Sequence, residues 1–133
     1  MRRQSREIAL QILFQLEYSP QISSEDMLAL FDEKKEESIM KYANEIIQGV
    51  QTHKVPIDQK IQEASRHWKI ERMGGVDRNI LRLSVFEIFH APEQIDHKIA
   101  INEAIEIAKI FGSQESASFV NGLLDQIVRN ERK

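Results

Sequence analysis

Three arginines near the start of the chain, and a row of side chains that follows them, have the residue types that bind single-stranded nucleic acid. The arginines are Arg2, Arg3 and Arg6, and the first acidic residue, Glu7, comes only after them. In a helix, Leu10, Phe14 and Tyr18 form one row that leads back past Glu7 to Arg3. Guanidinium groups neutralise phosphates, and aromatic rings stack on unpaired bases. The pattern indicates a nucleic-acid-binding strip; the alternative is that the row packs against another helix and the arginines are solvated.

Patterns typical of catalysis or metal binding are absent from the sequence. The four histidines, His53, His67, His90 and His97, never lie three or four residues apart, the spacing that presents two imidazoles to zinc from one helix. The chain has no cysteine, phosphate-binding glycine loop or nucleophile elbow. The sequence therefore predicts no enzyme, no metal and no cofactor, and favours a binding module.

Two carboxylates near the C-terminal end could suggest acid–base chemistry. Glu103 and Glu106 share a predicted helix with Lys109. No facing carboxylate or local apolar burial is implied, so we expect surface ion pairs there instead.

These residues must be positioned by helices, and the central one is predicted over residues 76–90. Its side chains are apolar nearly all round, which requires packing on several sides: Ile80, Leu81, Leu83, Val85, Phe86, Ile88 and Phe89. Asp77 is expected to cap its start, after Gly74-Gly75, and Pro92 to end it. Arg78 and Arg82 lie one helical turn apart, so their side chains project from the same side of the predicted helix.

Six further segments have helical spacing of apolar residues, and no stretch has the alternation of a strand. They cover residues 2–18, 24–31, 38–53, 56–68, 99–111 and 116–127. Ser23 or Ser24 is expected to cap the second of these, and Trp68 to share the apolar face of the fourth. The prediction is an all-α fold of about seven helices. It forms a single domain over 1–133, with subassemblies of about 1–54 and 55–133 that meet near Val55-Pro56.

Length and composition are consistent with a small intracellular domain. The chain has 133 residues, of which 41% are hydrophobic, enough for a core, and 29% are charged. The longest apolar run is too short for a membrane span or a signal peptide. The lack of cysteine fits a reducing compartment, so we expect a cytoplasmic protein without membrane contact. A net charge of −3 does not itself indicate nucleic acid, so the distribution of charge matters more than its sum.

Three segments of the chain carry recognisable motifs: RRQSREIALQILF at 2–14, VDRNILRLSVFEI at 76–88 and INEAIEIAKIFGSQESASFVNGLLD at 101–125. Together these three segments resemble the NusB family of bacterial transcription antitermination factors. The last is the most specific, because it combines INEA, AK-x-FG and FVNG-x-LD at the family's spacing. The resemblance implies an all-helical fold of two small three-helix subassemblies set across each other. It also implies binding to the boxA element of nascent ribosomal RNA together with NusE, a small-subunit ribosomal protein. The pair would nucleate a complex with other Nus factors on RNA polymerase.

The resemblance also implies which residues contact RNA. The family's arginine-rich motif corresponds to Arg2, Arg3 and Arg6, with Gln4 where many relatives have another basic residue, which would lower the RNA affinity. The aromatic residue of the FVNG motif corresponds to Phe119, a candidate for stacking on a base. The implied RNA-binding residues are Arg2, Arg3, Arg6, Phe14, Ser116 and Phe119.

For NusE, the family uses the surface around the start of the central helix. This chain offers Glu71, Asp77, Arg78 and Arg82 there. Such a mixed patch can pair with the charged groups of a ribosomal protein. The alternative is that Asp77 only caps its helix and the arginines pair with acids of this chain.

Two other functions stay open at this stage. The chain could be a protein-interaction adaptor or a homodimer without RNA activity, with the arginine face hidden. It could also be a module that serves an rRNA methyltransferase, because NusB-like domains precede the catalytic domain of certain such enzymes. A complete methyltransferase is excluded, since 133 residues leave no room for a cofactor-binding sheet.

Overall fold

The computed structural model describes residues 2–31 and 36–131, and within them the chain is helical without strands. The α-helices are α1 (Arg2–Tyr18), α2 (Ser24–Ala29), α3 (Glu37–Thr52), α4 (Lys54–Ala64), α5 (Gly75–Val85), α6 (His97–Phe111) and α7 (Ser116–Glu131). A 3-10 turn, η2 (Ile70–Arg72), precedes α5, and a π-helical turn, η3 (Phe86–His90), continues it. The predicted all-α fold with about seven helices is confirmed.

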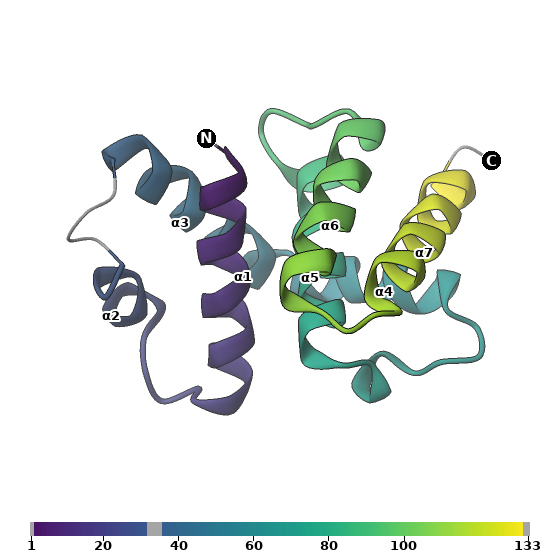
Figure 1. Ribbon diagram of the computed structural model, residues 1–133, viewed down its shortest axis with the longest axis horizontal. Coiled ribbons are helices and arrows are strands. Elements are labelled where there is room, and N and C mark those ends of the chain that lie inside the picture. The colour runs from purple at the N-terminus through teal and green to yellow at the C-terminus, as the bar shows by residue number, and fades with distance from the viewer. Residues whose placement is uncertain (1, 32–35, 132–133) are drawn as a thin grey trace.

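The helices form two groups that meet along α1 and α5. Helices α1, α2 and α3 lie together on one side, and α4 to α7 lie on the other (Figure 1). Helix α1 packs against both α3 and α5, and α6 packs against α5 and α7. Only His53 separates α3 from α4, so the predicted division at 54/55 falls in the first turn of α4. That division stays a prediction.

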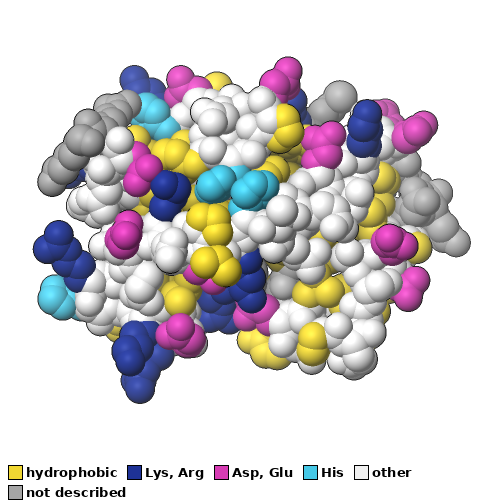
Figure 2. Space-filling model, turned by 180° about the vertical axis from the view of Figure 1, so that it is seen from behind, with side chains coloured by type: hydrophobic (Ala, Val, Ile, Leu, Met, Phe, Trp, Pro, Cys, Tyr) yellow, Lys and Arg dark blue, Asp and Glu magenta, His cyan; other side chains and the backbone are white. Residues whose placement is uncertain are grey.

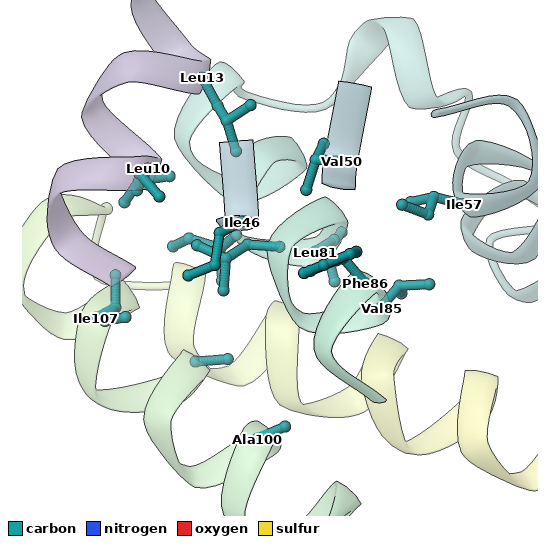
Figure 3. Packing of buried hydrophobic residues seen from close by; sticks show 14 of the residues in the cluster. Leu10, Leu13, Ile46, Val50, Ile57, Leu81, Val85, Phe86, Ala100 and Ile107 are labelled. Carbon is teal, nitrogen blue, oxygen red and sulfur yellow. The ribbon is translucent and has the colours of Figure 1, made fainter. Parts of the chain in front are cut away.

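One hydrophobic core runs through both groups. The apolar side chains predicted for the central helix are buried over Ile80–Ile88, and Phe89 is half-buried. Buried side chains from α1, α3, α4, α5 and α6 point toward one another (Figure 3): Leu10, Leu13, Ile46, Val50, Ile57, Leu81, Val85, Ala100 and Ile107. Each fully buried aliphatic side chain contributes about 1.5–3 kcal/mol. This core fixes α1 against α5.

Three helix boundaries need comment. Ser23 caps α2, because its hydroxyl accepts a hydrogen bond from the Asp26 N–H at 3.1 Å, as predicted. Asp77 does not cap α5, which begins at Gly75 with Gly74 in the N-cap position. Asp77 lies in the first turn instead, where the negative charge of its carboxylate interacts favourably with the positive end of the helix dipole. Helix α4 ends at Ala64, so the prediction that Trp68 shares its buried face is wrong; Trp68 is 54% exposed.

A close approach of α3 to η3 requires glycine at position 49. A Cβ atom on Gly49 would lie 2.1 Å from Cε1 of Phe86, whose side chain is enclosed in the core. Overpacking of a core costs about 1–3 kcal/mol, and this clash belongs at the upper end of that range. We therefore expect Gly49→Ala to lower the free energy of unfolding by about 2 kcal/mol, after about 1 kcal/mol is regained from helix propensity.

Gly122 provides the matched control, because it lies inside α7 and a Cβ there meets nothing within 4 Å. Gly122→Ala should raise the free energy of unfolding by about 0.5–1 kcal/mol. Urea denaturation of both variants measures the difference. Equal effects of the two substitutions would contradict the packing argument.

Candidate functional site

Arg3 is held at the surface by a carboxylate from the other half of the chain. Its Nε and Nη2 atoms donate to the two carboxylate oxygens of Glu103 at 2.9 and 2.8 Å, across a separation of 100 residues. Hydrogen bonding from Arg3, with the charges of Arg3 and Arg6, keeps the pKa of Glu103 below its ordinary value despite partial burial. The Arg3 side chain remains 45% exposed. Glu103 therefore orients the Arg3 guanidinium without enclosing it.

Arg6, by contrast, is buried. Its Nε donates to both carboxylate oxygens of Glu87 at 2.9 and 3.0 Å, and its Nη1 lies 3.4 Å from Glu103. The Tyr42 hydroxyl donates to the same Glu87 carboxylate, which is fully buried. Burial and this hydrogen bond raise the pKa of Tyr42 well above its ordinary value, so its hydroxyl keeps its proton. Arg6 thus anchors α1 to η3 and α6, and its predicted RNA contact stays a prediction.

Arg2 completes the basic end of α1. Its guanidinium lies 4.6 Å above the Tyr42 ring and 3.5 Å from the Glu93 carboxylate, and its side chain is 47% exposed. The starts of α1 and α6 lie at the same end of the molecule (Figure 1). Between them runs an open groove of about 750 Å³, which we call the arginine groove. It is lined by Arg2, Arg3, Arg6, Gln94, Ile95, Asp96, Ile99 and Glu103.

The predicted row along α1 does not form one continuous strip. Leu10 is buried, as the packing alternative expected, whereas Phe14 is half-buried and Tyr18 is 63% exposed. The Phe14 and Tyr18 rings lie 4.9 Å apart and cover Gly75, where a Cβ would lie 2.9 Å from Phe14. Eleven helical residues, about 16 Å, separate Phe14 from Arg3. Phe14 is thus placed at the start of α5, beside the predicted partner surface.

Ser116 and Phe119 lie at a third location, the start of α7. The Ser116 hydroxyl is buried and accepts a hydrogen bond from the Ser113 N–H at 2.9 Å, so it shapes the loop before α7. Phe119 is half-buried against the core. Because α7 begins where α6 ends, the part of α6 from Glu103 to Phe111, about 12 Å of helix, separates this location from the arginine groove. Their predicted RNA contacts stay predictions.

At the start of α5, both arginines predicted for partner binding pair with acids of this chain. Arg78 forms a bidentate ion pair with Glu17, and its Nη1 also donates to the backbone oxygens of Ile70 and Met73. Arg82 is 7% exposed. It bridges Glu17 at 3.0 Å and Asp58 at 2.9 Å.

The acidic members of the predicted partner surface are more accessible than its arginines. Glu71 is exposed and Asp77 is half-buried. Partner contacts of Glu71, Asp77, Arg78 and Arg82 stay predictions.

The pairing of these arginines with distant carboxylates was not predicted from the sequence. Glu17, Glu87 and Glu103 each accept from an arginine far along the chain, and spacing within one helix carries no information about such pairs. Glu87 carried a signal, because it is the acid that lies among the apolar residues of the predicted central helix.

Two histidines also meet without any signal in the sequence. The His53 and His90 rings stack 4.8 Å apart, and histidine side chains adjoin near the middle of the face in Figure 2. Burial, with the neighbouring His53 and Lys60, lowers the pKa of His90. Among residues 2–31 and 36–131, no three His, Asp or Glu side chains are grouped to hold a metal ion. None of the helices described is long and apolar enough to cross a membrane.

Comparison with known proteins gives concordant results. Residues 3–129 match the model of the NusB family. A transcription antitermination protein NusB of Bdellovibrio bacteriovorus is 53% identical over 126 residues, which are 95% of this chain and 93% of that protein. The corresponding protein of Myxococcus xanthus is 43% identical over 131 residues, covering 95% of this chain and 93% of that protein.

Solved structures have the same fold. T. maritima NusB superposes with a TM-score of 0.86 at 34% identity, covering 97% of this chain and 91% of that one. A crystal structure of the antitermination factors NusB and NusE with double-stranded RNA superposes with a TM-score of 0.84. It covers 97% of this chain and 96% of that one, and at 23% identity this match shows the fold alone. The chain therefore belongs to the NusB family, whose members named above are transcription antitermination proteins and not enzymes.

Proposed function

We propose that this chain is an antitermination factor that binds boxA-type single-stranded RNA of nascent ribosomal transcripts together with NusE. The observation that carries the proposal is the pair of half-exposed guanidinium groups, Arg2 and Arg3, on the edge of the arginine groove. The structural relative that holds NusB and NusE together with double-stranded RNA supports the choice of RNA and NusE as partners. On this proposal the chain works in the cytoplasm, and it reaches other Nus factors and RNA polymerase only indirectly.

The geometry suits the backbone of a flexible strand. Glu103 holds the planar Arg3 fork in one orientation, so little side-chain entropy is lost when Arg3 meets a phosphate. The Tyr42 ring contacts the Arg2 guanidinium through a cation–π interaction and orients it in a similar way. Phosphate contacts position a strand, while unstacked bases supply sequence preference in single-stranded RNA. Ile99, 57% exposed beside the groove, offers an apolar surface to such a base.

The start of α5 is the surface that we assign to NusE. Phe14 and Tyr18 present rings there over Gly75, and Asp77 and the exposed Glu71 lie on either side of Gly75 in the sequence. The Glu17 ion pairs below keep this surface rigid. Aromatic anchors with acidic neighbours suit a basic ribosomal protein. RNA and NusE would then occupy opposite ends of α1, so both can bind at once.

Replacing the two exposed arginines tests the RNA assignment. In Arg2→Gln/Arg3→Gln, two phosphate contacts are lost, so the slope of log K against log salt should become less steep by about 1.4 for single-stranded RNA. Affinity for boxA RNA should fall about tenfold or more at low salt. Fluorescence anisotropy of a labelled boxA RNA at two salt concentrations, with and without NusE, measures both quantities.

Arg129→Gln serves as the control, because Arg129 is an exposed arginine on α7 that pairs only with its helix neighbour Asp125 among the ion pairs described. It should leave the slope unchanged. If the double variant behaves like Arg129→Gln, the arginine groove is not the RNA site. If the wild type binds NusE and no RNA, the chain is a protein-interaction adaptor instead.

A further inference from the structure

The loop between α4 and α5 presents an aromatic side chain between cations. Trp68 is 54% exposed, and its neighbours Arg66, His67 and Lys69 are all exposed. Lys and Arg side chains and a histidine lie along the lower left edge of the molecule in Figure 2, with acidic side chains between them, on the side of the C-terminal helix group. We call residues 65–70 the Trp68 loop. It lies outside the arginine groove, and its last residue, Ile70, adjoins the start of α5, because the Ile70 carbonyl accepts from Arg78 at 3.2 Å.

The backbone of the Trp68 loop is fixed by two side chains. The Gln62 amide donates to the Ser65 and Trp68 carbonyl oxygens at 2.9 and 3.1 Å, and accepts from the Ile70 N–H at 3.0 Å. The Ser65 hydroxyl donates to the Trp68 carbonyl at 2.7 Å. Ser65 and Ile70 are buried at the two ends. The tripeptide 66–68 is therefore held out from the surface by a defined backbone conformation.

A single exposed apolar residue has no special meaning by itself. Trp68 differs because its backbone is fixed and because Arg66 and Lys69 flank it in the sequence, while the nearest acids in sequence, Glu63 and Glu71, lie outside the loop. An aromatic ring between cations is the arrangement with which proteins stack on bases and neutralise phosphates of single strands. A rigid ring loses little conformational entropy when a base stacks on it.

We propose that the Trp68 loop is a second binding site for single-stranded RNA, in which the Trp68 indole stacks on a base and Arg66 and Lys69 contact phosphates. The site extends the proposed RNA-binding function and rests on it. It would bind a part of the transcript other than the part in the arginine groove. Because every base has a π-face, this contact is expected to tolerate different sequences.

Trp68 supplies its own probe, because it is the single tryptophan of the chain. We would titrate the Arg2→Gln/Arg3→Gln variant with an oligouridine of about ten nucleotides, a length within the range of one single-strand site. Stacking should quench the tryptophan emission in a saturable way, in step with the anisotropy of the labelled RNA. Binding of the RNA without any change in emission would overturn the proposal.

Variants of the loop give the second measurement. Trp68→Ala should weaken oligouridine binding by roughly 5- to 100-fold with no change in salt slope, and Trp68→Phe should retain most of the affinity. Arg66→Gln/Lys69→Gln should make the slope less steep by about 1.4. Ile110→Ala is the matched control, because Ile110 is 60% exposed on α6. Full affinity of Trp68→Ala, or a loss of NusE binding alone, would show that the loop does not bind RNA.

The measurements distinguish a wrong assignment of the arginine groove from a wrong assignment of the Trp68 loop. If the arginine groove is not an RNA site, Arg2→Gln/Arg3→Gln binds boxA RNA normally while the Trp68 variants are still impaired. If the Trp68 loop is not an RNA site, the reverse pattern appears. If no RNA binds to the wild type in the anisotropy measurement, both proposals are wrong.

Discussion

Glu87→Ala is expected to lower the free energy of unfolding by about 3–5 kcal/mol, because it leaves the buried guanidinium of Arg6 with only its longer contact to Glu103 at 3.4 Å. Arg6 is 4% exposed and Glu87 is fully buried, so water cannot replace the lost carboxylate. The Tyr42 hydroxyl loses its acceptor at the same time. Denaturation with urea, followed by circular dichroism, measures the change. The expected loss is a large part of the 5–15 kcal/mol that stabilises an ordinary domain.

Removing both charges should be much less harmful than removing one. In Arg6→Met/Glu87→Leu no unpaired charge is buried, so we expect most of the lost stability to return. Glu106→Ala breaks only the exposed pair with Lys109 and should cost at most about 1 kcal/mol. The burial argument fails if Glu87→Ala is no more harmful than Glu106→Ala, or if the double variant is less stable than the single one.

Glu17→Gln is expected to cost about 2–3 kcal/mol at neutral pH, because Glu17 accepts from Arg78, Arg82 and Asn79 together. These bonds join the end of α1 to α5. The cost is below that for Glu87, since the Glu17 side chain is 23% exposed and Arg82 keeps Asp58. The same variant should weaken NusE binding if the start of α5 is the partner surface.

The contribution of Glu17 should depend on pH. Burial raises the pKa of Glu17, but hydrogen bonds from Arg78 and Asn79 and the charges of both arginines outweigh it, so the pKa lies below its ordinary value of 4.5. A carboxyl group with a lowered pKa adds stability above the unfolded-state pKa and loses it as the pH falls through the folded-state pKa. The difference between wild type and Glu17→Gln should therefore be full at pH 7 and shrink below about pH 4.5. A difference that stays constant down to pH 3 would contradict this.

The sequence predicts the helices well because each one has its own apolar periodicity. Residues 76–90 are predicted to be central, and residues 79–88 of this stretch are buried in the structure. Boundaries were missed where side chains compete for the backbone. The spacing of Ile57, Ile61 and Ala64 continues formally to Trp68, but Gln62 and Ser65 bond the following backbone and end α4.

The candidate site was predictable only in part. The residue types of Arg2, Arg3 and Arg6 indicated nucleic-acid binding, and the family resemblance assigned RNA contacts to them. Which guanidinium is exposed depends on carboxylates that approach from distant helices, so nothing near Arg3 and Arg6 in the sequence distinguishes them. The Phe14 ring likewise lies where it does because it packs against Gly75. This contact joins α1 to the start of α5, so the sequence near Phe14 does not predict it.

The long sequence separation of the α1 ion pairs affects how the protein is made. Arg6 and Glu87 are 81 residues apart, and Arg3 and Glu103 are 100 apart. A ribosome adds about 5–20 residues per second, so roughly 4–16 s pass between synthesis of Arg6 and of Glu87. During that interval the nascent chain has a cationic first turn without its carboxylate partners. Docking of this turn is thus a late event in co-translational folding, and it completes only after most of the 133 residues have been synthesised.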